Sequence, residues 1–273
     1  MSLHPEIVEL VRIALAEDIG SGDVTTELTI DAGRKAIGRF YARDLMTCAG
    51  TELLPLLFEK ADRLEIFLPS GSRCESGDCI AQVEGDARLL LTRERVALNF
   101  LQRLSGIATL TRRYVDAVEG TKAKVLDTRK TTPGLRRLEK MAVHAGGAVN
   151  HRMGLFDAVL IKNNHITACG GVRAAMERVK DANVPVEIEV RTRQELDEAL
   201  AMGAKRLLLD NLTPAEAKEW IAHIAGRAVV ELSGGITLDT IRAYAEAGPD
   251  FISCGAITHS AIARDLNFRI ELA

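Results

Sequence analysis

The stretch VPVEIEVRTRQELDEALAMGAKRLLLDN, residues 184–211, decides the fold. It opens with an apolar run at 184–190 and closes with a second one at 206–210. Thr192 and Glu195 between these runs form a capping box, which marks the start of a helix. A strand, a helix and a second strand of these lengths form a unit whose two strands run parallel. The stretch therefore predicts an α/β fold with a parallel sheet.

This unit repeats in the second part of the chain. Polar or glycine residues end the apolar runs at nearly equal spacing, with 21 residues from Glu189 to Asp210, 23 to Ser233 and 22 to Gly255. Six strands are too few for a standard eight-stranded barrel, and a G-x-G-x-x-G turn of a dinucleotide-binding sheet is missing. We therefore predict an open, incomplete α/β barrel. Its strands are Lys124–Asp127, Asp157–Ile161, Val184–Val190, Arg206–Asp210, Ala228–Leu232 and Phe251–Cys254.

Further signals bound the helices between these strands. Thr213, followed by Pro214 and Glu216, predicts a helix with its own capping box. Thr237 is predicted to cap the next helix. Gly203 and Gly248 follow helical segments and are suitable stop residues.

The first hundred residues have a different pattern. Residues 5–18 predict an amphipathic helix, and 36–43 and 64–68 predict short strands separated by glycine-rich turns. A helical pattern covers 92–118, with a bend expected near Ser105-Gly106. Together these segments predict a small antiparallel α+β domain before the barrel.

Composition and charge exclude several classes of protein. The 273 residues are 47% hydrophobic and 27% charged, with a net charge of −3, which is typical of a soluble globular protein and gives no support to nucleic-acid binding. No apolar stretch is long enough to span a membrane, and the N-terminus lacks a secretory signal pattern. The five cysteines make no C-x-x-C pair, so we expect reduced thiols and a cytoplasmic protein.

The active site of a β/α barrel lies at the carboxyl ends of its strands. Glu187 and Glu189 alternate with aliphatic residues, so both are predicted to face the barrel axis. One interpretation is a structural ion pair with a lysine or arginine inside the barrel. The other is a ligand or Mg²⁺ site that these carboxylates share with Asp210 on the next strand.

A basic cluster lies near the first strand end. Residues 122–140 contain Lys122, Lys124, Arg129, Lys130, Arg136, Arg137 and Lys140. For the last three, a solvated helix face is the simpler interpretation. Arg129, Lys130 and the later Lys162 follow strand ends directly, which favours binding of carboxylate or phosphate.

Glycine turns provide a second anion-binding signal. Ser233-Gly234-Gly235 lies between a strand and the helix that Thr237 is expected to cap, so backbone N–H groups can face a phosphate. Barrels often bind phosphate in their last two strand–helix loops. The site thus predicts a ligand with several negative charges, one of them a phosphate, together with a divalent metal.

Three motifs resemble the quinolinate phosphoribosyltransferase family. They are DTRKTTPGLR at 127–136, GGAVNHRMG at 146–154 and LIKNNHI at 160–166. Further matches are Gly22–Thr25, Glu94–Asn99, Glu187–Glu189, Leu209–Asn211 and Phe251–Ala256, so the likeness covers essentially the whole chain. The sequence departs from the family pattern at His144, Ala148 and Asn163.

The resemblance implies transfer of phosphoribosyl from phosphoribosyl pyrophosphate to quinolinate with decarboxylation. It further implies an N-terminal α/β sandwich at 1–102, an open barrel at 103–263 and a tail at 264–273 that returns to the first domain. The expected assembly is a homodimer or a higher oligomer, in which Arg95 reaches the active site of the partner.

Site roles are carried over from the resemblance. The quinolinate carboxylates would be held by Arg95, Arg129, His151 and Arg152, with Lys162 nearby. The catalytic residues, which handle phosphoribosyl pyrophosphate and Mg²⁺, would be Lys130, Lys162, Glu189 and Asp210, with Glu189 and Asp210 as the metal ligands. The 5′-phosphate would lie against Ser233, Gly234, Gly235, Gly255 and His259. Thr128, Ser253 and Cys254 complete the expected substrate-binding set.

Three other readings remain open. A Schiff-base lyase would use Lys162 as its nucleophile, but it leaves Arg129 and Arg152 unexplained. The molybdenum-transport-associated paralogue shares the fold, but those proteins diverge in motifs that are intact in this chain. A carrier-like module at 69–86 would need a lysine for modification, and that segment has none.

Overall fold

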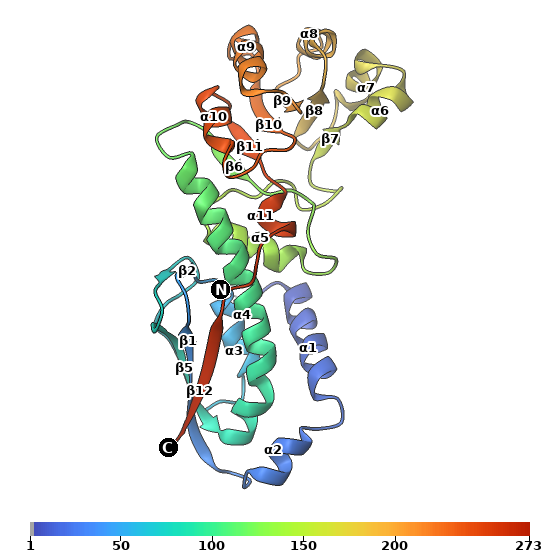
Figure 1. The fold of residues 1–273 in the computed structure, drawn as a ribbon. Coiled ribbons are helices and arrows are strands. Elements are labelled where there is room, and N and C mark those ends of the chain that lie inside the picture. Colours follow the sequence, from blue (N-terminus) through green and yellow to red (C-terminus); the bar gives the residue numbers. More distant parts are fainter. Residues whose placement is uncertain (1–2) are drawn as a thin grey trace. The chain divides into compact units, whose positions relative to one another are not determined.

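The computed structural model describes residues 3–273, which form two compact units (Figure 1). The first unit takes the chain up to Arg112 together with 132–147 and 260–273, and the second contains 113–131 and 148–259. The predicted division into 1–102 and 103–263 stays a prediction. No helix of the described residues is long and apolar enough to cross a membrane.

The first unit contains a four-stranded antiparallel sheet in the order β12-β1-β5-β3. Its strands are β1 (Lys35–Ala42), β3 (Arg63–Ile66), β5 (Cys79–Asp86) and β12 (Leu266–Leu272), beside the small pair β2 (Met46–Thr47) and β4 (Arg73–Cys74). Every second residue of β1 is buried, including Phe40. The predicted strands at 36–43 and 64–68 are confirmed, although β3 ends before Leu68.

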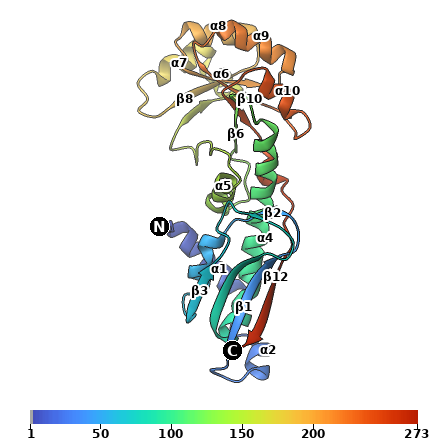
Figure 2. The ribbon, with the colours of Figure 1, turned by 90° about the vertical axis from the view of Figure 1, so that its left-hand side faces the viewer.

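The first unit also contains several helices, of which α4 runs alongside this sheet (Figures 1 and 2). They are α1 (Pro5–Ile19), α2 (Val24–Thr29), the 3₁₀ turn η1 (Thr51–Leu53), α3 (Leu54–Leu57), α4 (Ala87–Ala117) and α5 (Arg136–Ala145). The predicted helix at 5–18 is confirmed, with Gly20 at its end in a conformation with φ of 53°.

Helix α4 differs from the prediction at its start and near its middle. It begins at Ala87, where Asp86 Oδ1 accepts the N–H of Arg88 at 2.8 Å, and it is continuous across Gly106. A Cβ at Gly106 would lie 2.3 Å from the carbonyl oxygen of Ile262. The glycine therefore permits close packing of the backbone and does not break the helix.

The solvated face predicted for α5 is wrong for Lys140, which is only 1% exposed. Glu139 beside it is also buried and pairs with Arg103 at 2.8 Å. Arg137 is half-buried and pairs with Glu6. Sequence spacing alone could not reveal these neighbours, because they lie far away in the chain.

The second unit contains a parallel sheet in the order β6-β11-β10-β9-β8-β7. Its strands are β6 (Lys124–Leu126), β7 (Val159–Ile161), β8 (Val186–Val190), β9 (Arg206–Asp210), β10 (Val229–Ser233) and β11 (Phe251–Ser253). All six predicted strands are confirmed, with bounds that agree within two residues. Among the described residues, β6 and β7 are edge strands that do not pair with each other, so the barrel is open as predicted.

Helices connect these strands, and α7, α8 and α9 lie on one side of the sheet (Figures 1 and 2). They are α6 (Asn163–Cys169), α7 (Val172–Val179), α8 (Arg193–Ala201), α9 (Pro214–Ile224), α10 (Ile241–Glu246) and α11 (Ala256–His259). The capping boxes of α8 and α9 are confirmed. The predicted cap at Thr237 is wrong, because Thr240 accepts the N–H of Thr237 in a turn and α10 begins only at Ile241.

The strand register decides which side chains share the inner face of the sheet. Glu189 pairs with Leu208, and Leu208 pairs with Glu231. Paired residues of neighbouring strands point to the same face, and alternate residues of one strand do so too. The face that carries Glu187 and Glu189 therefore also carries Arg206, Asp210, Glu231 and Ser233.

Candidate active site

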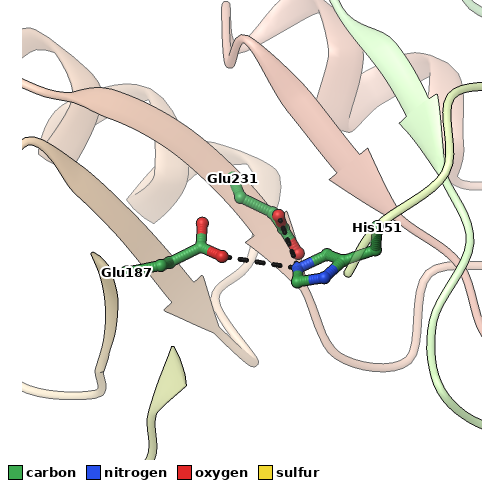
Figure 3. Close-up of side chains that lie close together, drawn as sticks. All are labelled: His151, Glu187 and Glu231. Carbon is green, nitrogen blue, oxygen red and sulfur yellow. Dashed lines mark ion pairs between the residues drawn. The ribbon is translucent and has the colours of Figure 1, made fainter. Parts of the chain in front are cut away.

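His151 lies between two glutamates inside the second unit (Figure 3). Its Nε2 is 3.4 Å from Oε2 of Glu187 on β8 and 3.3 Å from Oε2 of Glu231 on β10. Glu187 is 5% exposed and Glu231 is 1% exposed. We call these three residues the His–Glu–Glu cluster.

The rest of His151 is also held by the protein. Its backbone N–H donates to Oδ1 of Asp127 at 2.7 Å, and its Nδ1 accepts the backbone N–H of Arg152 at 2.8 Å. Asp127 follows β6 directly and is fully buried. The segment containing His151 is thereby tied to residues on or next to three strands, β6, β8 and β10.

The cluster favours one extra proton. Burial would lower the pKa of His151, but the carboxylates of Glu187 and Glu231 outweigh it and raise that pKa to about 9. Burial, together with the charge of Glu187, raises the pKa of Glu231. The N–H of Arg152 opposes protonation at Nδ1, since a protonated Nδ1 cannot accept a hydrogen bond. The two carboxylates therefore favour the protonated ring, and the hydrogen bond at Nδ1 weakens that preference.

Two arginines of the predicted set influence each other. Burial, followed by the charge of Arg129, lowers the pKa of Arg152. The guanidinium of Arg152 donates to the carbonyl of Ala158 at 2.9 Å, and Asp157 accepts the N–H groups of Met153 and Gly154. Two neighbouring cations, one of them on a braced loop, favour the binding of an anion.

A cavity of about 350 Å³ opens beside the cluster. His151, Arg152 and Glu187 line it, together with Arg206 and Phe251 from the first residues of β9 and β11. Because Arg206 and Phe251 begin their strands, the cavity extends toward the amino ends of the strands and away from the carboxyl ends, where the active site of a β/α barrel lies. Of the predicted site residues, the cavity brings together His151 and Arg152.

A second acidic pair lies at the carboxyl ends of β8 and β9. Nη2 of Arg191 is 2.9 Å from Oε1 of Glu189 and 3.2 Å from Oδ2 of Asp210. Asn211 also donates to Asp210 at 2.7 Å. The two carboxylates thus converge on one positive group, and such a set of hard oxygen donors fits a Mg²⁺ ion. We call Glu189 and Asp210 the rim pair.

The predicted phosphate turn follows β10. A Cβ at Gly234 would lie 2.3 Å from Oδ1 of Asn211, and the N–H of Asn211 donates to the carbonyl of Ser233 at 2.9 Å. Gly234 is therefore required for close packing of two neighbouring loops. The helix N-terminus expected directly behind this turn is absent there, because α10 begins at Ile241.

Lys130, Gly255 and His259 come together at the end of β11. A Cβ at Gly255 would lie 3.0 Å from Cδ of Lys130 and 3.2 Å from Nε2 of His259. Thr258 donates to the carbonyl of Lys130 at 2.8 Å, and Thr128 accepts the N–H of Lys130 at 3.0 Å. These contacts bring a lysine and a histidine together around a glycine.

Ser253 and Cys254 differ in position. Ser253 is buried on the inner face and its hydroxyl donates to the carbonyl of Leu232 at 3.5 Å. Cys254 alternates to the other face, and burial, followed by the charge of Glu231, raises its pKa to about 12. All five cysteines are free thiols. A substrate contact of Cys254 would therefore have to come from its backbone.

Lys162 and Arg95 are both exposed side chains. Lys162 is exposed directly after β7, and His165 accepts its backbone N–H at 2.9 Å. Arg95 is exposed on α4, in the first unit. Their assigned roles stay predictions.

Sequence reasoning missed three residues of these clusters. Glu231 lies two residues before Ser233 in a strand, and this alternation was the available signal. Asp127 was recognised only as a strand end, and Arg191 directly follows β8. Glu187 was expected to face the barrel axis, which is confirmed, and its pairing with His151 was not foreseen.

Comparison with known proteins covers nearly the whole chain. Residues 23–105 match the N-terminal domain of quinolinate phosphoribosyl transferase, and residues 107–269 match its C-terminal domain. A probable nicotinate-nucleotide pyrophosphorylase [carboxylating] of Bacillus subtilis is 38% identical, over 99% of this chain and 95% of that protein. The enzyme of that name from Mycobacterium leprae is 40% identical, over 94% and 95%.

A solved structure agrees with these matches. The nicotinate-nucleotide pyrophosphorylase from Francisella tularensis superposes with a TM-score of 0.93 at 37% identity, covering 98% of each chain. The antiparallel domain and the open parallel barrel therefore agree with the fold of this solved structure. The chain belongs to the quinolinate phosphoribosyltransferase family.

Proposed function

We propose that this chain transfers the phosphoribosyl group of phosphoribosyl pyrophosphate to quinolinate, releasing pyrophosphate and CO₂ and forming nicotinate mononucleotide. One observation carries the proposal beyond family membership. The neighbouring cations Arg129 and Arg152 lie on the barrel unit that also bears the rim pair. A site with these opposite charges matches one dianionic acid and one sugar phosphate.

Quinolinate binding depends on the arginines. The planar guanidinium groups of Arg129 and Arg152 each offer a two-point fork to a carboxylate. Lys162 adds a point charge nearby, and Arg95 of the partner subunit closes the site in a homodimer or a higher oligomer. Fixing both carboxylates orients the ring nitrogen toward the sugar, which lowers the entropic cost of reaction.

The rim pair handles the sugar. Glu189 and Asp210 hold ribose hydroxyls, and they would also hold a Mg²⁺ ion, which would supply positive charge to the leaving pyrophosphate. Lys130 supplies a further positive charge toward the phosphates. The 5′-phosphate lies against the turns at 233–235 and 255–259, where backbone N–H groups and His259 can donate to it.

The chemistry follows from these placements. The bond between C1 of ribose and the pyrophosphate oxygen breaks, and carboxylates beside the sugar favour its developing positive charge. The ring nitrogen forms the new bond to C1 and becomes cationic. That charge stabilises the electron pair left on the adjacent carbon when CO₂ departs, and a proton from water then bonds to that carbon, so decarboxylation requires no additional cofactor.

The cellular location of the enzyme is cytoplasmic in this proposal. Support comes from the reduced cysteines and from the bacterial relatives, which carry no organelle in their names. Plant relatives such as that of Arabidopsis thaliana are named chloroplastic. Fractionation of source cells with an antibody to the protein would test this part.

The function is tested by supplying quinolinate, phosphoribosyl pyrophosphate and Mg²⁺ and following nicotinate mononucleotide. Nicotinate run in parallel should react at least about a hundredfold less efficiently, because it leaves one cationic fork unpaired. Equal use of both acids, or no product with quinolinate, would contradict the proposal. The Schiff-base alternative would instead show a borohydride-trapped adduct at Lys162, although exposure of that lysine does not favour such activation.

A further inference from the structure

We propose that Glu187 and Glu231 are positioning residues for quinolinate binding. They fix the imidazole of His151, and the fixed His151 segment in turn holds the guanidinium of Arg152 in place. The inference rests on the proposed function in one respect, namely that Arg152 binds a quinolinate carboxylate. Neither glutamate touches substrate or takes part in the chemistry.

The first argument is that the polar groups of His151 are engaged within the protein. Asp127 accepts its backbone N–H, Arg152 donates to Nδ1, and the two glutamates face Nε2. Turning the ring toward a ligand would sacrifice contacts on both nitrogens. A substrate carboxylate at Nε2 would also lie against two carboxylates already there (Figure 3). The protein therefore holds the ring of His151 in one orientation.

The second argument concerns burial. Glu187 and Glu231 are 5% and 1% exposed, their carboxylates lie 3.4 and 3.3 Å from Nε2 of His151, and Arg206 lies 4.0 Å from Oε1 of Glu187. Burying such carboxylates is costly, and apolar residues of similar size often give a more stable interior. Retaining two acids here is explained if they serve the site, because local violations of packing rules concentrate at functional positions.

The third argument links the cluster to Arg152. This arginine lies near the like charge of Arg129, so the two guanidinium groups repel each other when no anion is bound. The carboxylate of Glu187 acts on Arg152 with the opposite sign. Together with the hydrogen bond from the Arg152 N–H to His151, this attraction keeps Arg152 beside Arg129 before quinolinate binds.

The test is Glu231→Gln, which keeps shape and removes charge. By calorimetry, the Kd for quinolinate should rise about tenfold, since small displacements of a binding group are this costly. The KM for phosphoribosyl pyrophosphate should stay within about twofold, and kcat at saturating quinolinate should be largely retained. The ¹⁵N signals of His151, assigned by comparison with His151→Gln, should shift. Glu231→Asp should restore much of the affinity.

A matched control separates positioning from general stability. Glu139→Gln removes another fully buried carboxylate, which pairs with Arg103 in the first unit. It should lower the unfolding temperature without a selective change in quinolinate affinity. If Glu231→Gln does not fold, Glu187→Gln carries the same expectations.

Two results would overturn the inference. One is an unchanged quinolinate Kd together with unchanged His151 signals in Glu231→Gln. The other is an equal loss of affinity for both substrates, as expected from loosened structure alone. A wild-type protein that fails to bind quinolinate would instead contradict the proposed function, and the ¹⁵N comparison would still report whether the glutamates fix His151.

Discussion

Two acidic pairs share the inner face of the barrel sheet, and they differ in the groups that balance their charge. The His–Glu–Glu cluster is balanced by an imidazole that is 13% exposed and held at both nitrogens. The rim pair is balanced by Arg191, whose side chain is 44% exposed. A counter-charge that can withdraw into solvent can be exchanged for a ligand, whereas a buried one cannot.

This difference separates two residues of one strand. Glu187 and Glu189 lie two positions apart on β8 and point to the same face, and both are 5% exposed. The alternation of side chains along the strand therefore predicts the same surroundings for both glutamates. Their ion-pair partners differ, because a loop histidine pairs with Glu187 and an exposed arginine pairs with Glu189. Position within the barrel thus distinguishes a supporting carboxylate from one available to the substrate.

The largest expected effect comes from the rim pair. Asp210→Asn removes a charge that faces the reacting sugar, so kcat/KM for phosphoribosyl pyrophosphate should fall about a thousandfold, as when a preorganised electrostatic group is removed. Steady-state assays at saturating quinolinate measure it. A loss of less than threefold would mean that the rim pair is as structural as the buried cluster.

Removal of a cation that binds quinolinate should lower activity nearly as much as the loss of Asp210. Arg129→Ala leaves a buried substrate carboxylate unpaired, which corresponds to a loss of about 2–5 kcal/mol in binding or transition-state stabilisation. The loss should appear in kcat/KM for quinolinate. A kcat/KM close to wild type would show that Arg152 and its neighbours bind quinolinate without Arg129. That result would contradict the role proposed for Arg129.

The buried cluster predicts a pH-dependent stability. Because the pKa of His151 is raised from 6.5 to about 9, its contribution is fully present below pH 6.5 and is lost as pH rises toward 9. The change from this group is at most about 3 kcal/mol. Urea unfolding at both pH values should show a smaller decrease in His151→Gln than in wild type. Equal decreases in the free energy of unfolding of the two proteins would show that protonation of His151 does not stabilise the fold.

The smallest effect concerns the exchangeable counter-charge. Arg191→Gln should tighten Mn²⁺ binding to the free protein about fivefold, since removing one nearby cation at a wet surface is worth about 1 kcal/mol. Metal titration followed by electron paramagnetic resonance measures this directly. Arg193→Gln is the control, because that arginine faces Glu219 instead. Weaker metal binding in Arg191→Gln would identify Arg191 as a ligand-holding residue.

Periodicity and turn signals predicted most of the fold. The six barrel strands and the caps at Thr192 and Thr213 depend on local patterns, and the structure confirms them. The cap at Thr237 failed because Thr240, three residues later, forms a competing turn. Local sequence does not show at which of the two threonines the helix begins.

The candidate site was less predictable, because its contacts join distant segments. The roles of Glu231 and Asp127 depend on His151, which reaches them from another loop. Lys140 looked solvated because its helix carries several charges, but tertiary packing buries it. Likewise, the contacts of Arg191 with Glu189 and Asp210 exist only because the ends of two strands lie side by side.

The comparison of Glu187→Gln with Glu189→Gln tests the central claim most directly, since the same change is made twice on one strand. Quinolinate Kd and phosphoribosyl pyrophosphate kcat/KM are measured for both variants. Glu187→Gln should weaken quinolinate binding about tenfold and leave the sugar phosphate nearly unaffected, whereas Glu189→Gln should lower kcat/KM for the sugar phosphate about a hundredfold and leave quinolinate binding intact. Identical effects of the two variants on both substrates would contradict the account.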